Sequence, residues 1–177
     1  MKSLTHYIQE KLIIKKNKSA NYNYFPESKE ELKDIILKRI KDEGNEVDLN
    51  DIDVSKITDM SNLFERTDFN GDVSNWDVSK VTDMSDMFSG CTKFNSDISK
   101  WDVSNVANMT YMFYWCKKFN KDISNWDVSN VKNMRYMFAY CKSFNKDISN
   151  WDVSNVKGKL FIFDNCPIKE KYKPKFK

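Results

Sequence analysis

The chain has 177 residues, with 29 Lys and Arg against 26 Asp and Glu, and a formal net charge of +3. Hydrophobic residues make up 40% and aromatic residues 14% of the sequence, a content that excludes a disordered chain. This charge balance is too mild to predict a nucleic-acid partner from net charge alone, and we expect none. No apolar run reaches the ~20 residues of a membrane span, and the single histidine, His6, leaves histidine-based catalysis and metal binding without their usual ligand.

Residues 1–25 are predicted to form an amphipathic N-terminal segment and a linker. Apolar residues recur at helical spacing, at Leu4, Tyr7, Ile8 and Leu12. Polar residues interrupt the apolar stretch that a secretory signal requires, so we expect a cytoplasmic or phage-associated protein unless another export route exists. The opening M-K-S-L-x-x-Y-I-Q-E-K resembles the short leader of internal head proteins of large tailed phages, which is cut after a motif such as Ile8-Gln9-Glu10.

Residues 26–50 are predicted to form a helical N-terminal cap. Ser28 and Glu31 follow Pro26 with capping-box spacing, and Gly44 supplies a helix stop. The apolar face consists of Leu32, Ile35, Ile36 and Ile40. We expect this amphipathic helix to seal the first coil of an array that begins near residue 51.

A 25-residue repeat dominates residues 51–166 and decides the predicted fold. Three residue types keep this period: Trp76, Trp101, Trp126 and Trp151; Cys91, Cys116, Cys141 and Cys166; and the Phe-Asn pairs that begin at Phe69, Phe94, Phe119 and Phe144. In each unit, a half such as 119–128 predicts very short strands and a half such as 131–141 predicts a helical or 3₁₀ segment. One unit cannot bury its apolar stripe alone. We therefore predict an α/β solenoid of about five strand-plus-short-helix repeats with leucine-rich-repeat-like coils.

The unit M-F-x-x-C-x-x-F-N-x-D-I-S-x-W-D-V-S-N-V, which recurs from about Asp51 to Cys166, resembles the repeat of BspA-like leucine-rich-repeat surface proteins. The resemblance implies a right-handed solenoid that serves adhesion or protein binding, with no catalytic residues, and a location at the cell surface. Residues 167–177 come after the array and are predicted to form a solvated basic tail.

The cysteine column predicts buried packing. A step of 25 residues supplies none of the close cysteine pairs that zinc sites need, and free cysteine behaves as a small buried hydrophobe. A second column, Asn70, Asn95, Asn120 and Asn145, is expected to form an amide ladder between coils.

Two aspartate columns leave a calcium-dependent repeat protein as an alternative. They comprise Asp72, Asp97, Asp122 and Asp147, and Asp77, Asp102, Asp127 and Asp152. Stacked carboxylates repel one another, and calcium would compensate. A serine two positions after each aspartate instead favours local turns bonded to backbone N–H groups. We therefore predict no metal site and no cofactor.

The sequence predicts no enzyme and no catalytic residues. A nucleophile needs a nearby base, and the only histidine lies outside the array. The acidic residues repeat identically in every unit, whereas an active site is normally singular.

Variation between repeats marks the candidate binding surface. The predicted partner-binding residues are Tyr111, Tyr114, Trp115, Lys118, Arg135, Tyr136, Tyr140 and Phe161. Such aromatic residues suit a protein or glycan partner, and the alternative is that the rings only pack between coils. The predicted function is a non-catalytic protein-binding or adhesion module, with a phage structural or packaged head protein as a further alternative.

Overall fold

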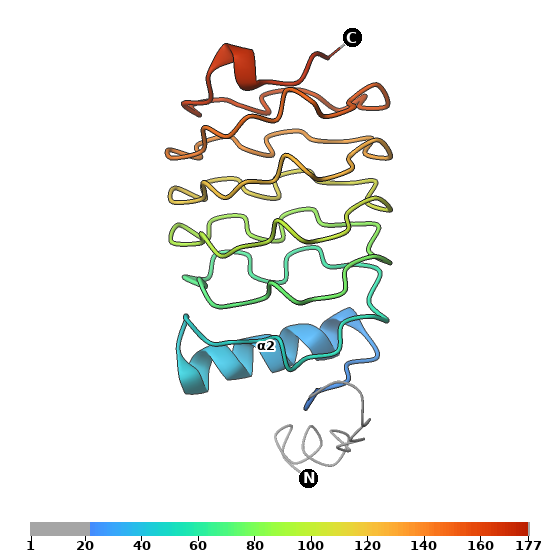
Figure 1. The fold of residues 1–177 in the computed structure, drawn as a ribbon. Helices are drawn as coiled ribbons and strands as arrows, with labels where there is room; N and C mark the ends of the chain where they lie inside the picture. Colours follow the sequence, from blue (N-terminus) through green and yellow to red (C-terminus); the bar gives the residue numbers. More distant parts are fainter. Residues whose placement is uncertain (1–21, 177) are drawn as a thin grey trace.

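The computed structural model describes residues 22–176, so the predicted leader and most of the N-terminal amphipathic segment lie outside the described residues. The chain forms a stack of windings, with helix α2 (Lys29–Glu43) at one end and the 3₁₀ turn η1 (Glu170–Tyr172) at the other (Figure 1). In the 25-residue register, the windings run over 45–69, 70–94, 95–119, 120–144 and 145–169, and are called windings 1 to 5. None of the helices among residues 22–176 is long and apolar enough to cross a membrane.

The prediction of strand-plus-short-helix repeats, and with it a leucine-rich-repeat-like α/β solenoid, is wrong. Residues 22–176 contain no β-strand. The segments predicted to be repeat helices form turns, and both α2 and η1 lie outside these segments. Neighbouring windings are instead joined by isolated parallel bridges. One column of such bridges runs through Asp59, Asp83, Asn108, Asn133 and Gly158. The repeat is therefore built from turns and bends.

The backbone hydrogen bonds explain why the apolar spacing wrongly predicted a helical segment in each repeat. The N–H of Met134 donates to Gly158 of the next winding (2.8 Å), whereas the N–H of Met137 reaches back to Met134 (3.1 Å). Tyr136, between them, has a φ of 55°, and a left-handed residue cannot continue a right-handed helix. Consecutive tight turns therefore produce the apolar spacing of three and four that also characterises a helix.

Ladders of identical side chains fill the core. The rings of Phe88, Phe113 and Phe138 are fully buried, and successive centroids lie 5.8 and 5.6 Å apart. The Trp101 Nε1–H donates to the Val73 carbonyl of the preceding winding (3.0 Å). Cys116 is buried and unbridged, and its Sγ donates to the Phe88 carbonyl (3.0 Å). The prediction of buried cysteine packing is confirmed at Cys91, Cys116 and Cys141.

Helix α2 covers the first winding and begins where the capping box predicts. The Ser28 Oγ accepts the Glu31 N–H (3.2 Å), and Gly44 ends the helix with a φ of 93°. Its buried residues, Leu32, Ile35 and Ile36, join the core cluster that runs through the windings. The helix thus supplies the apolar surface that winding 1 would otherwise receive from a preceding winding.

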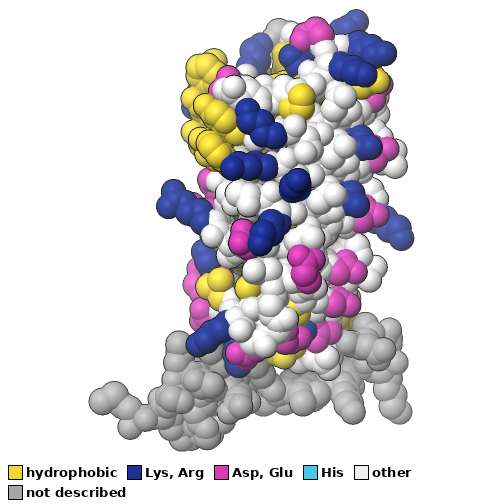
Figure 2. Space-filling model, turned by 90° about the vertical axis from the view of Figure 1, so that its left-hand side faces the viewer, with side chains coloured by type: hydrophobic (Ala, Val, Ile, Leu, Met, Phe, Trp, Pro, Cys, Tyr) yellow, Lys and Arg dark blue, Asp and Glu magenta, His cyan; other side chains and the backbone are white. Residues whose placement is uncertain are grey.

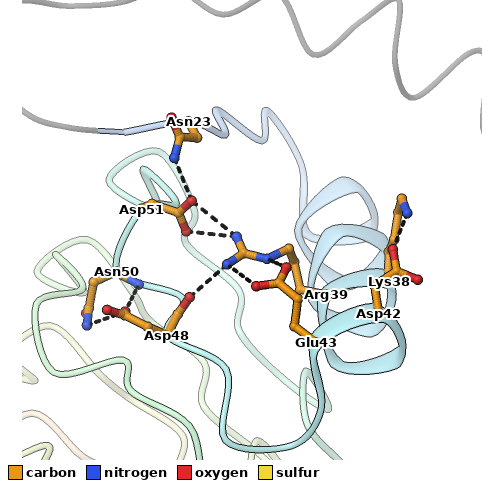
Figure 3. A network of polar contacts seen from close by, with 8 residues as sticks. All are labelled: Asn23, Lys38, Arg39, Asp42, Glu43, Asp48, Asn50 and Asp51. Carbon is orange, nitrogen blue, oxygen red and sulfur yellow. Dashed lines mark hydrogen bonds and ion pairs between the residues drawn. The ribbon is translucent and has the colours of Figure 1, made fainter.

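Arg39 ties α2 to the start of winding 1 (Figure 3). Its Nη1 donates to the Asp51 Oδ1 (2.9 Å) and its Nη2 to the Asp48 carbonyl (3.0 Å), and it also pairs with Glu43. Asn23 donates to the other Asp51 oxygen (2.8 Å). Burial opposes the charge of the guanidinium, but hydrogen bonds to Glu43 and Asp51 raise the pKa of Arg39.

The C-terminal residues close the other end of the stack. Ile168 and Pro174 are buried, and Tyr172 and Phe176 pack against the core cluster. The Tyr172 carbonyl accepts the Ile148 N–H (3.0 Å). The expectation of a solvated tail is therefore wrong for these apolar side chains, and the basic side chains between them form an outer surface.

Candidate functional site: an aromatic strip on windings 3 to 5

The six predicted aromatic residues lie together on one side of windings 3 to 5. Figure 2 shows exposed hydrophobic side chains gathered along the left-hand edge of its upper half, where these windings lie, with Lys and Arg beside them. We call this group the aromatic strip; its members are Tyr111, Tyr114, Trp115, Tyr136, Tyr140 and Phe161.

Two stacks of rings run along the strip, parallel to the axis of the windings. In the first, Tyr136 lies between Tyr111 and Phe161, with centroid distances of 4.8 and 5.1 Å. In the second, Trp115 stacks on Tyr140 at 5.0 Å. Stacked aromatic pairs contribute about 0.5–1.5 kcal/mol beyond their burial, so the rings hold one another in place.

Tyr114 joins the two stacks. Its ring meets Tyr111 at 5.2 Å and Tyr140 at 5.7 Å, in both cases nearly perpendicular. The strip aromatics nevertheless lie outside the core cluster, and Trp115 and Phe161 remain 37% and 56% exposed. The rings do pack between windings, as the alternative interpretation expected, but they do so at the surface.

The backbone under the strip is left-handed. Tyr111, Trp115, Tyr136, Tyr140 and Phe161 have φ values between 55° and 62°, and such a conformation costs an ordinary L-residue about 1–2 kcal/mol. The corresponding left-handed positions outside the strip hold Asn62, Arg66, Asp86, Gly90 and Asn165. Gly, Asn and Asp tolerate this region better than bulky residues do. The turn therefore needs a left-handed residue, but it does not need an aromatic one.

This left-handed backbone was not predicted from the sequence, although a signal was present. Asn62, Gly90 and Asn165 stand in register with aromatic residues, and a column that mixes Asn and Gly with aromatics is typical of a left-handed turn position.

Basic side chains lie directly over the rings. The Lys117 Nζ lies 4.8 Å from the Trp115 centroid and the Lys142 Nζ 5.7 Å from the Tyr140 centroid. Partial burial and the phenol of Tyr136 raise the pKa of Tyr111, and Arg135 acts in the opposite sense. The predicted Lys118 is exposed. The ring contacts belong to Lys117 and Lys142, which are not among the predicted partner-binding residues.

The aspartate columns form turns. The Asp97 Oδ1 accepts the Ser99 N–H (2.9 Å), and the Asp127 Oδ1 accepts the Ser129 N–H (3.0 Å). These hydrogen bonds lower the pKa of both aspartates. The same turn occurs at Asp72, Asp77, Asp102, Asp122, Asp147 and Asp152. The turn interpretation is confirmed, and residues 22–176 contain no group of three or more His, Cys, Asp or Glu side chains that could hold a metal ion.

The asparagine column connects successive windings. The Asn70 Oδ1 accepts the Asn95 N–H (2.7 Å), and Asn95 and Asn120 repeat the bond one winding further along (3.0 and 3.1 Å). Each side-chain oxygen accepts from a backbone N–H rather than from the side-chain amide of the next asparagine, and the side chains are half-buried.

The comparisons with known proteins show a family of repeat proteins. No curated protein and no solved structure matches the chain. The profile of one family matches residues 35–128 and 106–172, and in general terms this is the BspA-like repeat family that the sequence resembles. Because these matches cover well over half of the chain, the protein belongs to the family described as "Mycoplasma protein of unknown function, DUF285".

Proposed function

We propose that this chain is a non-catalytic binding module that holds a protein partner on the aromatic strip. The observation that carries the proposal is the placement of bulky aromatic residues at left-handed surface positions. The turn does not require these side chains, and the core does not contain them. Aromatic residues are enriched at protein interfaces, so partner binding accounts for their presence.

The arrangement of the rings favours a protein over a glycan or a single-stranded nucleic acid. Sugars and bases stack on open aromatic faces, whereas both faces of Tyr136 are covered by Tyr111 and Phe161. The strip offers the edges of its stacked rings, which carry partial positive charge, together with phenol hydroxyls and the ammonium groups of Lys117 and Lys142. Backbone carbonyls and carboxylates of a protein complement these groups.

The chemistry of the buried thiols supports a role without catalysis. Burial raises the pKa of Cys91 to about 12 and raises the pKa of Cys116 and Cys141 well above its ordinary value. A reactive cysteine needs an accessible thiolate with a lowered pKa. These thiols have the opposite environment.

Site-specific photo-crosslinking tests the proposal. A photoreactive phenylalanine analogue is placed at Tyr136, and in a matched control at Asn125, which is exposed outside the strip. With extract from the native source, we expect a protein adduct from position 136 only, and its loss when Tyr140→Asn is added. Equal adducts from both positions, or an adduct that contains carbohydrate and no peptide, would contradict a protein partner on the strip.

A further inference from the structure

Charge is strongly polarised along the stack. Residues 22–100 carry 18 acidic and 10 basic side chains, whereas residues 101–176 carry 7 acidic and 13 basic ones. Figure 2 shows Asp and Glu concentrated in the lower half of this face, with Lys and Arg prominent in the upper half beside the aromatic strip. Two such molecules attract one another side by side when they run in opposite directions and repel when they run in the same direction.

The columns of the strip continue into windings 1 and 2 with small or charged residues. The N–H of Arg66 and the N–H of Tyr140 each donate to the following winding (2.8 and 2.7 Å), so these residues occupy equivalent places. The place of Trp115 is taken in winding 2 by Gly90, and the place of Tyr111 by Asp86. The bulky half of each column is therefore matched by a half with small or charged residues, in which the Arg66 side chain lies beside Gly90.

We propose that the aromatic strip binds windings 1 and 2 of a second copy of this chain, with the two stacks antiparallel. This inference rests on the proposed function and names the partner. A twofold axis perpendicular to the stacks, between windings 2 and 3, sets winding 3 on winding 2 of the other copy and winding 4 on winding 1. The same axis places each column opposite itself.

This pairing sets the bulky rings of one copy against the smaller and charged residues in windings 1 and 2 of the other. Trp115 faces Gly90 of the second copy, which has no side chain of its own and is bordered by the Arg66 side chain. Tyr140 faces Arg66, whose side chain is 85% exposed and whose nearest carboxylate, Glu65, is 3.4 Å away. A phenol hydroxyl such as that of Tyr140 can accept a hydrogen bond from an arginine, and Tyr and Arg are both frequent at interface hot spots.

The acidic end of the same face favours a cationic partner. Glu65 and Asp83 lie near Asp86, and burial together with these like charges raises the pKa of Asp86. In the antiparallel pair, Lys117 and Lys142 of the other copy approach this end. Lys142 meets Asp68, which within its own chain pairs with the exposed Lys93 (3.3 Å). Four windings spaced ~4.8 Å apart form a contact smaller than the ~800 Å² per partner of a standard interface, so the dimer is weak and sensitive to salt.

Sedimentation equilibrium of the full chain tests the pairing. We expect a monomer–dimer equilibrium at low salt whose association constant falls about tenfold or more between about 0.05 and about 0.5 M salt. A chain that stays monomeric at low salt up to the highest soluble concentration would overturn the inference. An association that strengthens with salt would do the same.

A charge exchange tests the register. Lys142→Glu and Asp68→Lys, each alone, are expected to weaken association about tenfold, and the two together to restore it because the pair re-forms with opposite signs. Lys100→Glu changes the net charge as Lys142→Glu does but lies in a separate polar pocket with Asp72 and Asp97, and it should leave association unchanged. A double variant as weak as either single variant would refute the register, provided that all variants melt as the unaltered chain does.

The crosslinking experiment separates this inference from the proposed function. An adduct from position 136 to a peptide of winding 1 of another copy supports both. An adduct to a different protein, from a chain that does not dimerise, refutes the self-pairing and leaves the proposed function in place. A monomeric chain with no protein adduct refutes both.

Discussion

At the scale of single residues, the left-handed positions separate what folding requires from what the surface offers. Asn62 and Gly90 satisfy the turn at little conformational cost, whereas Tyr136 and Tyr140 meet the same backbone demand at φ values of 55° and 62°. Strained residues often occur at functional sites. Here the stacking of each ring on its neighbours offsets the strain.

Replacing a strip aromatic with asparagine is expected to leave the fold nearly unchanged. Tyr136→Asn and Tyr140→Asn should each alter the free energy of unfolding by less than about 1 kcal/mol, because the loss of stacking is offset by relief of the left-handed backbone. Urea unfolding measures this value. Phe113→Ala, in the core ladder, is the control and should cost about 3–5 kcal/mol. A cost of that size at Tyr136 would show that its ring is part of the core.

The aspartate turns are expected to make the stability of the stack sensitive to acid. Hydrogen bonds from Ser104, Ser124 and Ser129 lower the pKa of the aspartates two positions before them. A carboxylate whose folded pKa is lowered stabilises the native state above its unfolded pKa, and this contribution disappears as the pH falls through the folded pKa. We therefore expect the melting temperature to fall as the pH drops below about 4.

Replacing turn aspartates with asparagine tests whether these carboxylates cause the acid sensitivity. Asn133 already forms the same turn, since its Oδ1 accepts the Arg135 N–H (3.1 Å). Asp102, Asp122 and Asp127 replaced together by Asn should therefore keep the fold at neutral pH and flatten the acid dependence. An unchanged acid dependence would place its origin in other carboxylates.

At the scale of the winding, side-chain periodicity was predictable and backbone conformation was not. The 25-residue recurrence of Trp, Cys and Phe identifies which side chains stack, since equivalent residues of successive windings must share an environment. The same pattern cannot distinguish a helix from a run of tight turns, because both place apolar residues three and four apart. In windings 3 and 4 the left-handed residues are tyrosines and a tryptophan, which ordinarily argue against such turns.

The candidate site shows a similar division. Its aromatic members could be found because they vary between repeats, and alignment alone brings Tyr111, Tyr136 and Phe161 together. Which lysines reach the rings depends on side-chain direction at the turn, and it is Lys117 and Lys142 that do so.

The hydrogen bonds of the asparagine column are expected to contribute measurably to the free energy of unfolding. Asn120→Ala removes the acceptor of the Asn145 N–H (3.1 Å), and an unsatisfied half-buried donor should lower the free energy of unfolding by about 1 kcal/mol. Urea unfolding with Asn125→Ala as an exposed control measures the difference. Equal effects of the two substitutions would mean that water replaces the ladder bond without cost.

At the scale of the whole molecule, both ends of the stack are closed by segments that differ from the repeat. Leu32 and Ile36 of α2 cover the first winding, and Ile168 and Tyr172 cover the last. Stacked repeats expose core surface at their ends unless a cap covers it, so the array is closed within the described chain.

Removal of calcium by a chelator is expected to leave the melting temperature of the protein unchanged. The column aspartates already accept serine N–H groups, for example from Ser99 to Asp97 (2.9 Å), so no cation is needed to organise them. The melting temperature with excess chelator should equal that with added calcium. A midpoint that rises with calcium but not with magnesium would revive the calcium-dependent alternative, since a ligand of the native state stabilises it by mass action.

The asparagine ladder also bears on how such an array changes in evolution. Because Asn95 offers the Asn120 N–H the same acceptor that Asn120 offers Asn145, a gene that lost residues 120–144 would bring Asn95 against Asn145 with the junction still in register. Recombination between near-identical coding segments can therefore lengthen or shorten the molecule without inventing a single new contact. A copied 120–144 segment would also carry its own tyrosine pair, Tyr136 and Tyr140, so each such copy would lengthen the exposed aromatic surface by one winding.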